Sequence, residues 1–241
     1  MPEIKRVQQT LGAGGKTYIG DCKMGALPTR AWVAGSGDYS VGPLAGPQMP
    51  AAALDKLLAP VFSGAQGLEP VYPPQTQAHP RLIAEGYEGR VEREAEVDGH
   101  PVQWQERRLV VRSVAHAARQ AEHLEERLRQ AVTEIGHLTE PQPGKEILAA
   151  EAMPAAAQRI LEHRRVAGLV TSATATTTQP TTKRKYGARE AEVRVESRST
   201  LRAQIETEAV AAAKQRLGWR VYATNQGRLA LGAVILAYRG Q

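Results

Sequence analysis

The sequence predicts an α/β chain interrupted by a β-rich insertion with a helical hairpin, so that the whole chain is α+β. Three observations predict this fold class. A strand–helix–strand pattern occupies residues 17–44, a β-hairpin and a long amphipathic helix follow over 82–138, and a helix–strand–helix pattern returns over 205–238. An α/β pattern on both sides of a different architecture is typical of one domain inserted into another.

The first unit, predicted over 1–45, contains the elements of an α/β domain. Residues 2–11 predict a helix, residues 17–21 a short apolar strand that ends in an acid, residues 24–35 a second helix, and residues 39–44 a second strand. Apolar residues at helical spacing indicate the second helix. The order strand, helix, strand is the building block of an α/β domain.

A connector and an insertion are predicted next. Residues 46–80 are rich in proline and are expected to leave the first unit, with a short helix near 52–58. The insertion is predicted over 81–204. It begins with a β-hairpin over 82–112, because apolar and charged residues alternate on both sides of the turn signal Asp98-Gly99.

Residues 113–138 form the clearest helix of the sequence. Apolar residues recur there at alternating steps of three and four, which makes a heptad seam. The seam consists of Val114, Ala117, Ala121, Leu124, Leu128, Ala131, Ile135 and Leu138. Residues 145–163 are also expected to be helical, with Pro154 starting a second piece. A helical hairpin over 113–163 is therefore predicted, and pairing of the seam with a second copy of the chain is the alternative.

Two further strands are predicted in the insertion, over 166–178 and 192–201, because Val and Thr are frequent in the first and residues alternate strictly in the second. Residues 205–241 then return to the first unit as helix, strand and helix. The last helix ends without a capping signal, which predicts that this part of the fold is cut short.

The charge balance favours a polyanionic partner. The 241 residues carry a formal net charge of +6, and a basic balance is frequent in proteins that bind nucleic acid. Cys22 is the only cysteine, so the sequence excludes an intrachain disulfide and a cysteine zinc cluster. No apolar stretch approaches the ~20 residues that span a bilayer, and an intracellular protein without a membrane partner is expected.

A basic segment is the first candidate site. Residues 181–203 contain seven positive and three negative charges, and they begin with a predicted loop at 181–187. The candidate DNA-binding residues are Lys183, Arg184, Lys185 and Arg189. A basic loop joined to a strand can contact phosphates. A solvated face is the alternative interpretation.

Asp21 is the second candidate. It follows a short apolar strand and precedes a helix. Ligand sites in α/β folds gather at strand ends, and Mg²⁺ prefers oxygen ligands such as a carboxylate. An aspartate at this position more often caps the helix that follows. The pattern alone leaves both roles open.

Three strings of the sequence resemble one protein family. They are residues 18–24 (YIGDCKM), residues 216–225 (RLGWRVYATN) and residues 234–241 (VILAYRGQ). The first resembles the region around the second catalytic aspartate of insertion-sequence transposases of the DDE class, in the IS-four branch with the YREK signature. The other two resemble the strand and the start of the last helix in the same proteins. A large β-rich insertion before the final glutamate is also a feature of that family.

The resemblance implies a ribonuclease H-like core in which three carboxylates hold two divalent metals, Mg²⁺ or Mn²⁺, to cut and join DNA strands. Asp21 matches the second carboxylate, so it is the expected catalytic residue and metal ligand. Tyr238 matches the signature tyrosine. Arg239 lies near the signature arginine but out of register, since that position is Gln241.

The other two carboxylates have no counterpart among the 241 residues. The chain is therefore expected to be an inactive fragment by itself and to hold no metal tightly, and whether it acts as an enzyme stays open. The resemblance implies as partners the insertion-sequence ends and the target DNA, a homodimer in a synaptic complex, and a location in the bacterial cytoplasm with the nucleoid. A non-catalytic nucleic-acid-binding or oligomerisation module is the alternative function.

Overall fold

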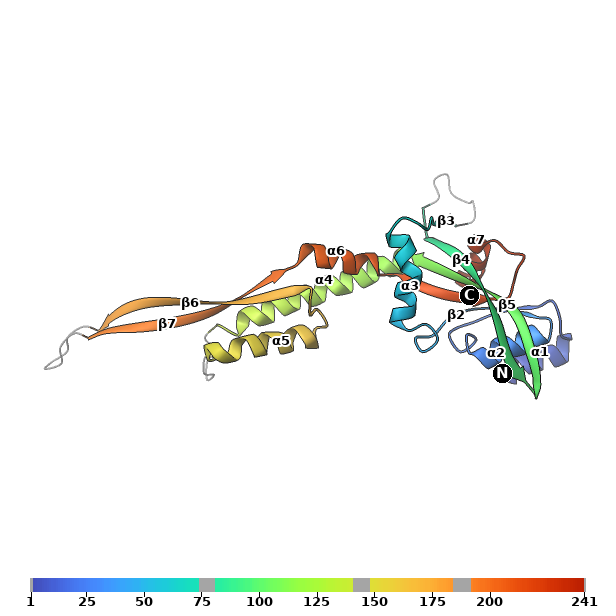
Figure 1. The fold of residues 1–241 in the computed structure, drawn as a ribbon, viewed down its shortest axis with the longest axis horizontal. Coiled ribbons are helices and arrows are strands. Elements are labelled where there is room, and N and C mark those ends of the chain that lie inside the picture. Colours follow the sequence, from blue (N-terminus) through green and yellow to red (C-terminus); the bar gives the residue numbers. More distant parts are fainter. Residues whose placement is uncertain (1, 74–80, 141–147, 184–191, 241) are drawn as a thin grey trace. The chain divides into compact units, whose positions relative to one another are not determined.

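A computed structural model describes residues 2–73, 81–140, 148–183 and 192–240, with side chains described outside 179–198 (Figure 1). The chain divides into two compact units. Unit 1 consists of Met1–Ala118 and Leu217–Gln241, and unit 2 consists of Arg119–Arg216. Unit 1 is therefore built from two stretches that are far apart in the sequence. Among the described helices, none combines the length and the apolar character needed to cross a membrane.

Unit 1 contains a mixed six-stranded sheet in the order β1-β2-β8-β5-β4-β3. Its strands are β1 (Thr17–Ile19), β2 (Tyr39–Pro43), β3 (Glu69–Val71), β4 (Ala84–Val97), β5 (His100–Ser113) and β8 (Trp219–Thr224). β1 runs parallel to β2, and every other neighbouring pair in this sheet is antiparallel. The strands predicted at both ends of the chain and the hairpin predicted between them thus share one sheet.

Helices cover both faces of this sheet. They are α2 (Leu27–Gly35), α3 (Ala51–Phe62) and α7 (Leu231–Arg239), while α1 (Pro2–Leu11) bonds through Gln8 to Trp32 of α2 and to Ser36 after it. Side chains alternate between the faces of a strand, so the register assigns each residue to a face. α7 packs against one face, here called the α7 face, and α2 and α3 pack against the other, here called the α2/α3 face.

The α7 face carries the larger apolar cluster of unit 1. It consists of Val41, Val71, Ala84, Leu109, Val111, Tyr222, Leu231, Val234 and Ile235. Leu231, Val234 and Ile235 lie at helical spacing on α7 and are each at most 2% exposed. Full burial of an aliphatic side chain stabilises a fold by about 1.5–3 kcal/mol. The helix is therefore held to the sheet by its apolar stripe.

The α2/α3 face is partly apolar and partly charged. Leu58 of α3 packs with Val110, Trp219 and Val221 of the sheet. Nearer to α2, the buried residues on this face include Glu106 and its partner Arg30. A buried ion pair on an otherwise apolar face makes this region of the sheet unusual, because charges are rarely buried without compensation.

Unit 2 combines a helical hairpin with a two-stranded ribbon. Its elements are α4 (Val114–His137) from Arg119 onward, the short 3₁₀ helix η1 (Ala150–Ala152), α5 (Met153–His163), β6 (Val170–Lys183), β7 (Glu192–Ile205) and α6 (Thr207–Gln215). On α4 the buried seam residues are Leu124, Leu128, Ala131 and Ile135, and on α5 they are Met153, Ala157 and Leu161. α5 lies along α4 (Figure 1), and Arg164 after α5 bonds to Glu134 of α4. The seam is thus buried inside the single chain.

Several predicted boundaries were wrong. The second helix begins at Leu27 rather than at residue 24, because residues 21–26 form a turn and Pro28 suits the first turn of a helix. β6 begins at Val170 and continues to Lys183, so Thr181 to Lys183, which were predicted as loop, belong to the strand. β6 pairs with β7 along its whole length, from Val170 with Ile205 to Lys183 with Glu192. This pairing explains why the strand extends beyond its threonine-rich part.

Replacing Ile235 by alanine is expected to lower the free energy of unfolding by about 2–4 kcal/mol, because the site is buried and leaves a cavity. Urea denaturation followed by circular dichroism measures the change. Leu229, which is 38% exposed in the loop before α7, provides the matched control Leu229→Ala, with a change below about 0.5 kcal/mol. Equal, small losses in both variants would contradict the packing of α7 on the sheet.

Candidate functional site

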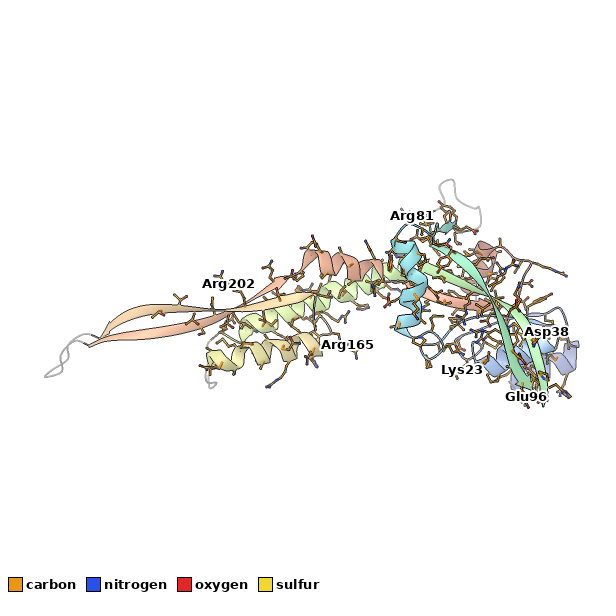
Figure 2. The ribbon with its side chains drawn as sticks, in the orientation of Figure 1. Lys23, Asp38, Arg81, Glu96, Arg165 and Arg202 are labelled. Atoms are coloured by element: carbon orange, nitrogen blue, oxygen red, sulfur yellow. The ribbon has the colours of Figure 1, made fainter. Side chains whose placement is uncertain are left out.

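Asp21 lies in a tight turn that follows β1. Its Oδ1 accepts the backbone N–H of Lys23 at 2.9 Å, and its carbonyl accepts the N–H of Met24 at 3.0 Å. The Asp21 side chain is exposed, and Lys23, labelled in Figure 2, is exposed beside it. The carboxylate therefore caps this turn through one oxygen and presents its surface to solvent.

Glycines allow the turn to lie directly against β2. A Cβ on Gly42 would meet the carbonyl oxygens of Gly20 and Asp21, each at 3.3 Å, and one on Gly25 would lie 2.6 Å from the carbonyl oxygen of Pro43. A side chain at Gly25 would displace the turn from the strand, and one at Gly42 would make a tight contact with it. The sequence thus fixes where Asp21 sits through glycines on both segments.

The C-terminal end of α7 reaches the same end of β2. Tyr222 of β8 pairs with Pro43 in register. The ring of Tyr238 on α7 meets the Tyr222 ring edge-on, with centroids 4.9 Å apart and planes at 65°. Because Asp21 lies against Gly42, the residue before Pro43, the Asp21 turn and the Tyr238 end of α7 are both anchored at this end of the strand.

The two tyrosines form an apolar contact rather than an ionised pair. Burial raises the pKa of the Tyr222 hydroxyl, and Tyr238 raises it further. The phenol therefore stays protonated at neutral pH. Arg239 lies next to Tyr238, and its Nη1 donates to the carbonyl oxygen of Ile83 at 3.2 Å. These contacts tie the last turn of α7 to the sheet.

The loop before α7 is held by buried polar side chains that the sequence did not single out. Arg107 donates from Nη1 to the carbonyl oxygens of Gln226 at 2.6 Å and Leu229 at 2.7 Å, and it pairs with Glu88 of β4. The side chain of Arg107 is only 6% exposed. Its guanidinium thus fixes the loop from which α7 starts.

Asn225 continues the β2–β8 ladder beyond the end of β8. Its Oδ1 accepts the N–H of Ser40 at 2.8 Å, and its Nδ2 donates to the carbonyl oxygen of Asp38 at 2.8 Å. Burial raises the pKa of the Asp38 carboxyl, but hydrogen bonds from Gln8 and from the backbone of Lys16 outweigh it, so the net pKa is lowered. Asp38 therefore stays ionised and holds the start of β2 (Figure 2).

Glu106 is the centre of a second polar group on the α2/α3 face. Its residue is 1% exposed, and it pairs with Arg30 of α2, while Arg93 and Arg108 approach its Oε1 at 3.4 and 3.6 Å through their Nε atoms. Arg30 also donates from Nε to the carbonyl oxygen of Gly25 at 2.9 Å. Glu106 is two residues after Trp104 on the same strand, so the predicted alternation puts both on the apolar side of the hairpin. A charged residue on the apolar side is the signal for a buried ion pair, and the sequence analysis did not use it.

The candidate DNA-binding residues belong to unit 2. Lys183 ends β6 and pairs with Glu192, but its side chain is not described. Arg184, Lys185 and Arg189 lie outside the described residues. The solvated or phosphate-contacting role predicted for this segment therefore stays a prediction.

The residues around Asp21 do not make a two-metal site by themselves. Among the described residues there is no group of three or more His, Cys, Asp or Glu side chains that could hold a metal ion. Two metals about 3.5–4 Å apart need several shared carboxylate oxygens. Asp21 offers one carboxylate, of which one oxygen already accepts the N–H of Lys23. This donor set fits a single contact to a hard cation and not the pair that the resemblance implies.

Comparisons with known proteins find no relative. No protein-family model matches the chain, and neither a curated protein nor a solved structure is significantly similar to it. The function is therefore argued from the residues and their geometry.

Replacing Arg107 by glutamine is expected to lower the free energy of unfolding by about 2–4 kcal/mol, because two carbonyl oxygens and Glu88 lose a buried partner. Hydrogen exchange of peptides covering 225–239 should also become faster. Arg112→Gln is the matched control, since Arg112 pairs with Glu85 on the same two strands but is 35% exposed. Unchanged exchange at 225–239 in Arg107→Gln would contradict the role given to Arg107.

Proposed function

We propose that this chain is part of the catalytic core of a DDE transposase of the IS-four branch with the YREK signature, with a ribonuclease H-like fold and DNA as its substrate. One observation carries the proposal. Asp21, which matches the second catalytic carboxylate, is the second residue after β1, and its turn lies against Gly42 near the end of β2. Tyr238, which matches the signature tyrosine, packs on Tyr222, the partner of Pro43 in the same strand. Two matches from opposite ends of the sequence thus lie near one end of β2, the Asp21 turn on the α2/α3 face and Tyr238 on the α7 face.

The arrangement of unit 1 supports this proposal. β1 and β2 form a parallel pair joined through α2, and helices lie on both faces of the sheet. Ligands of open α/β sheets bind outside the carboxyl ends of the strands, which is where Asp21 lies. Unit 1 also consists of two separate stretches of chain with unit 2 between them, which is compatible with an inserted domain.

The predicted domain boundaries stay an interpretation. The core was predicted over 1–45 and 205–241, with a connector over 46–80 and the insertion over 81–204. The compact units are divided differently, since the β4–β5 hairpin shares the sheet of β2 and β8. The two compact units are defined by contacts in the folded chain, whereas the predicted boundaries follow the family resemblance.

The alternative is a non-catalytic nucleic-acid-binding or oligomerisation module. It is favoured by the hydrogen bond from Lys23 to Asp21, because a turn-capping aspartate needs no metal. Oligomerisation through the α4 seam is less supported, since its residues are buried within the chain. Light scattering coupled to size-exclusion chromatography separates the cases, because a monomer is expected when the seam packs against α5.

The 241-residue chain is expected not to cleave DNA, because one matched carboxylate cannot hold two metal ions. A nicking assay on supercoiled DNA with Mg²⁺ or Mn²⁺ measures this. Asp21→Asn is the matched variant, since asparagine can keep the turn hydrogen bond but lacks the charge. Metal-dependent nicking that disappears in Asp21→Asn would contradict the expected inactivity.

Duplex DNA is expected to bind with little sequence preference and strong salt dependence. About four phosphate contacts would lower the affinity roughly a hundredfold between 50 and 200 mM salt. Fluorescence anisotropy measures the slope for the chain and for a Lys183→Gln, Arg184→Gln, Lys185→Gln triple variant. The matched control removes three exposed charges elsewhere in unit 2, at Arg129, Arg159 and Arg165. An affinity that does not change with salt would contradict DNA binding.

A further inference from the structure

Three arginines surround one buried carboxylate on the α2/α3 face. Arg30, Arg93 and Arg108 all lie within ion-pair distance of Glu106. One negative charge thus faces three positive charges, which leaves a local surplus of two. A surplus of this kind in a half-buried setting is costly unless a further anion approaches, because buried charges need compensation.

Arg30 alone satisfies most of what Glu106 requires. It pairs with Oε2 of Glu106 and is itself fixed by the carbonyl oxygen of Gly25, and its side chain is 6% exposed. Arg93 and Arg108 instead reach only Oε1, each through Nε. In the described part of the chain, no acceptor is bonded to the terminal Nη groups of these two arginines. The Nη N–H groups of both arginines are therefore available to bind a ligand.

The surroundings of Arg108 leave room for a ligand. Across the sheet, Arg108 pairs with Ala223 on one side and with Gly89 on the other, and Ala223 pairs in turn with Gly42. A Cβ on Gly89 would meet no atom within 4 Å. The side chains of Arg93 and Arg108 are 29% and 20% exposed, so both can be reached from solvent. The Nε of Arg108 is buried without a hydrogen-bond acceptor.

We propose that Arg93 and Arg108 form an oxyanion site for a phosphate group, held in position by Glu106 and Arg30. Guanidinium groups bind phosphate oxygens through two parallel N–H donors, which lysine cannot do. Oε1 of Glu106 lies 3.4 Å from the Nε of Arg93 and 3.6 Å from the Nε of Arg108, so its charge offsets the repulsion between the two arginines. Glu106 is thus a positioning residue, and the arginines are the ligands.

The site lies in the same row of the sheet as the Asp21 turn. Gly42, where an added Cβ would lie 3.3 Å from the carbonyl oxygen of Asp21, is two strands away from Arg108, or about 10 Å at the usual strand spacing. The identity of the ligand rests on the proposed transposase function: it is a backbone phosphodiester of the DNA that passes Asp21. Free phosphate shares the same chemistry, and the experiment separates the two sources.

Two titrations of the full chain test the site. In the first, inorganic phosphate is added while the ¹⁵N–¹H signals of the arginine Nε groups are recorded. In the second, a 20-base-pair duplex is titrated by anisotropy against the chain and an Arg93→Gln, Arg108→Gln variant. The matched control is Arg90→Gln, Arg220→Gln, which removes two exposed arginines on the α7 face of unit 1. Thermal unfolding confirms that both variants fold.

The proposal predicts that phosphate shifts the Nε signals of Arg93 and Arg108. It also predicts that the Arg93→Gln, Arg108→Gln variant loses roughly tenfold or more in duplex affinity, with a salt slope smaller by about two. The control should lose clearly less. Duplex binding that is equal in the variant and the control would overturn the site while leaving the transposase proposal intact. Phosphate shifts without any duplex binding would keep the oxyanion site, with free phosphate as its ligand, and overturn the transposase proposal.

Discussion

The central sheet depends on the pairing of β8 with strands from the other end of the chain. β8 lies between β2 and β5, and it pairs with β5 from Trp219 through Thr224. Without it, β1–β2 and β3–β4–β5 would be two separate sheets, and a two-stranded sheet such as β1–β2 is only marginally stable alone. Residues around 219–224 therefore join every other element of unit 1, including the turn that holds Asp21.

Buried polar groups hold β8 and its neighbours in register. Arg107 and Asn225 fix the loop that leads from β8 into α7, while Arg30 ties the turn after Asp21 to Glu106 of β5. Each of these groups costs desolvation free energy, which hydrogen bonds and ion pairs must offset. An apolar sheet would be easier to bury, but it would not align the strand ends so specifically. The polar network thus links the stability of the sheet to the geometry around Asp21.

Much of the secondary structure could be predicted from the sequence, because the local patterns were strong. The heptad seam of α4 and the turn at Asp98-Gly99 both follow from short-range spacing, and both lie where the patterns placed them. Sheet order could not be predicted, because β5 and β8 are neighbours in the sheet although all of unit 2 separates them in the sequence. Asp21 was proposed as a site residue from its place after a strand, and that role stays a prediction. Glu106 and Arg107 were missed, because a charged residue in an alternating strand looks exposed until its partners from other elements are known.

The chain offers a direct test of whether DNA lies at Asp21. Cys22 is the only cysteine, is exposed, and follows Asp21 immediately, so a tethered iron chelate can be attached there to generate hydroxyl radicals locally. The account predicts strong cleavage of bound duplex within a few base pairs of one position. A chelate moved to exposed Leu229 in a Cys22→Ser, Leu229→Cys chain provides the comparison. Equal or absent cleavage from Cys22, with the duplex bound, would contradict the assignment of this strand end as the DNA-facing centre.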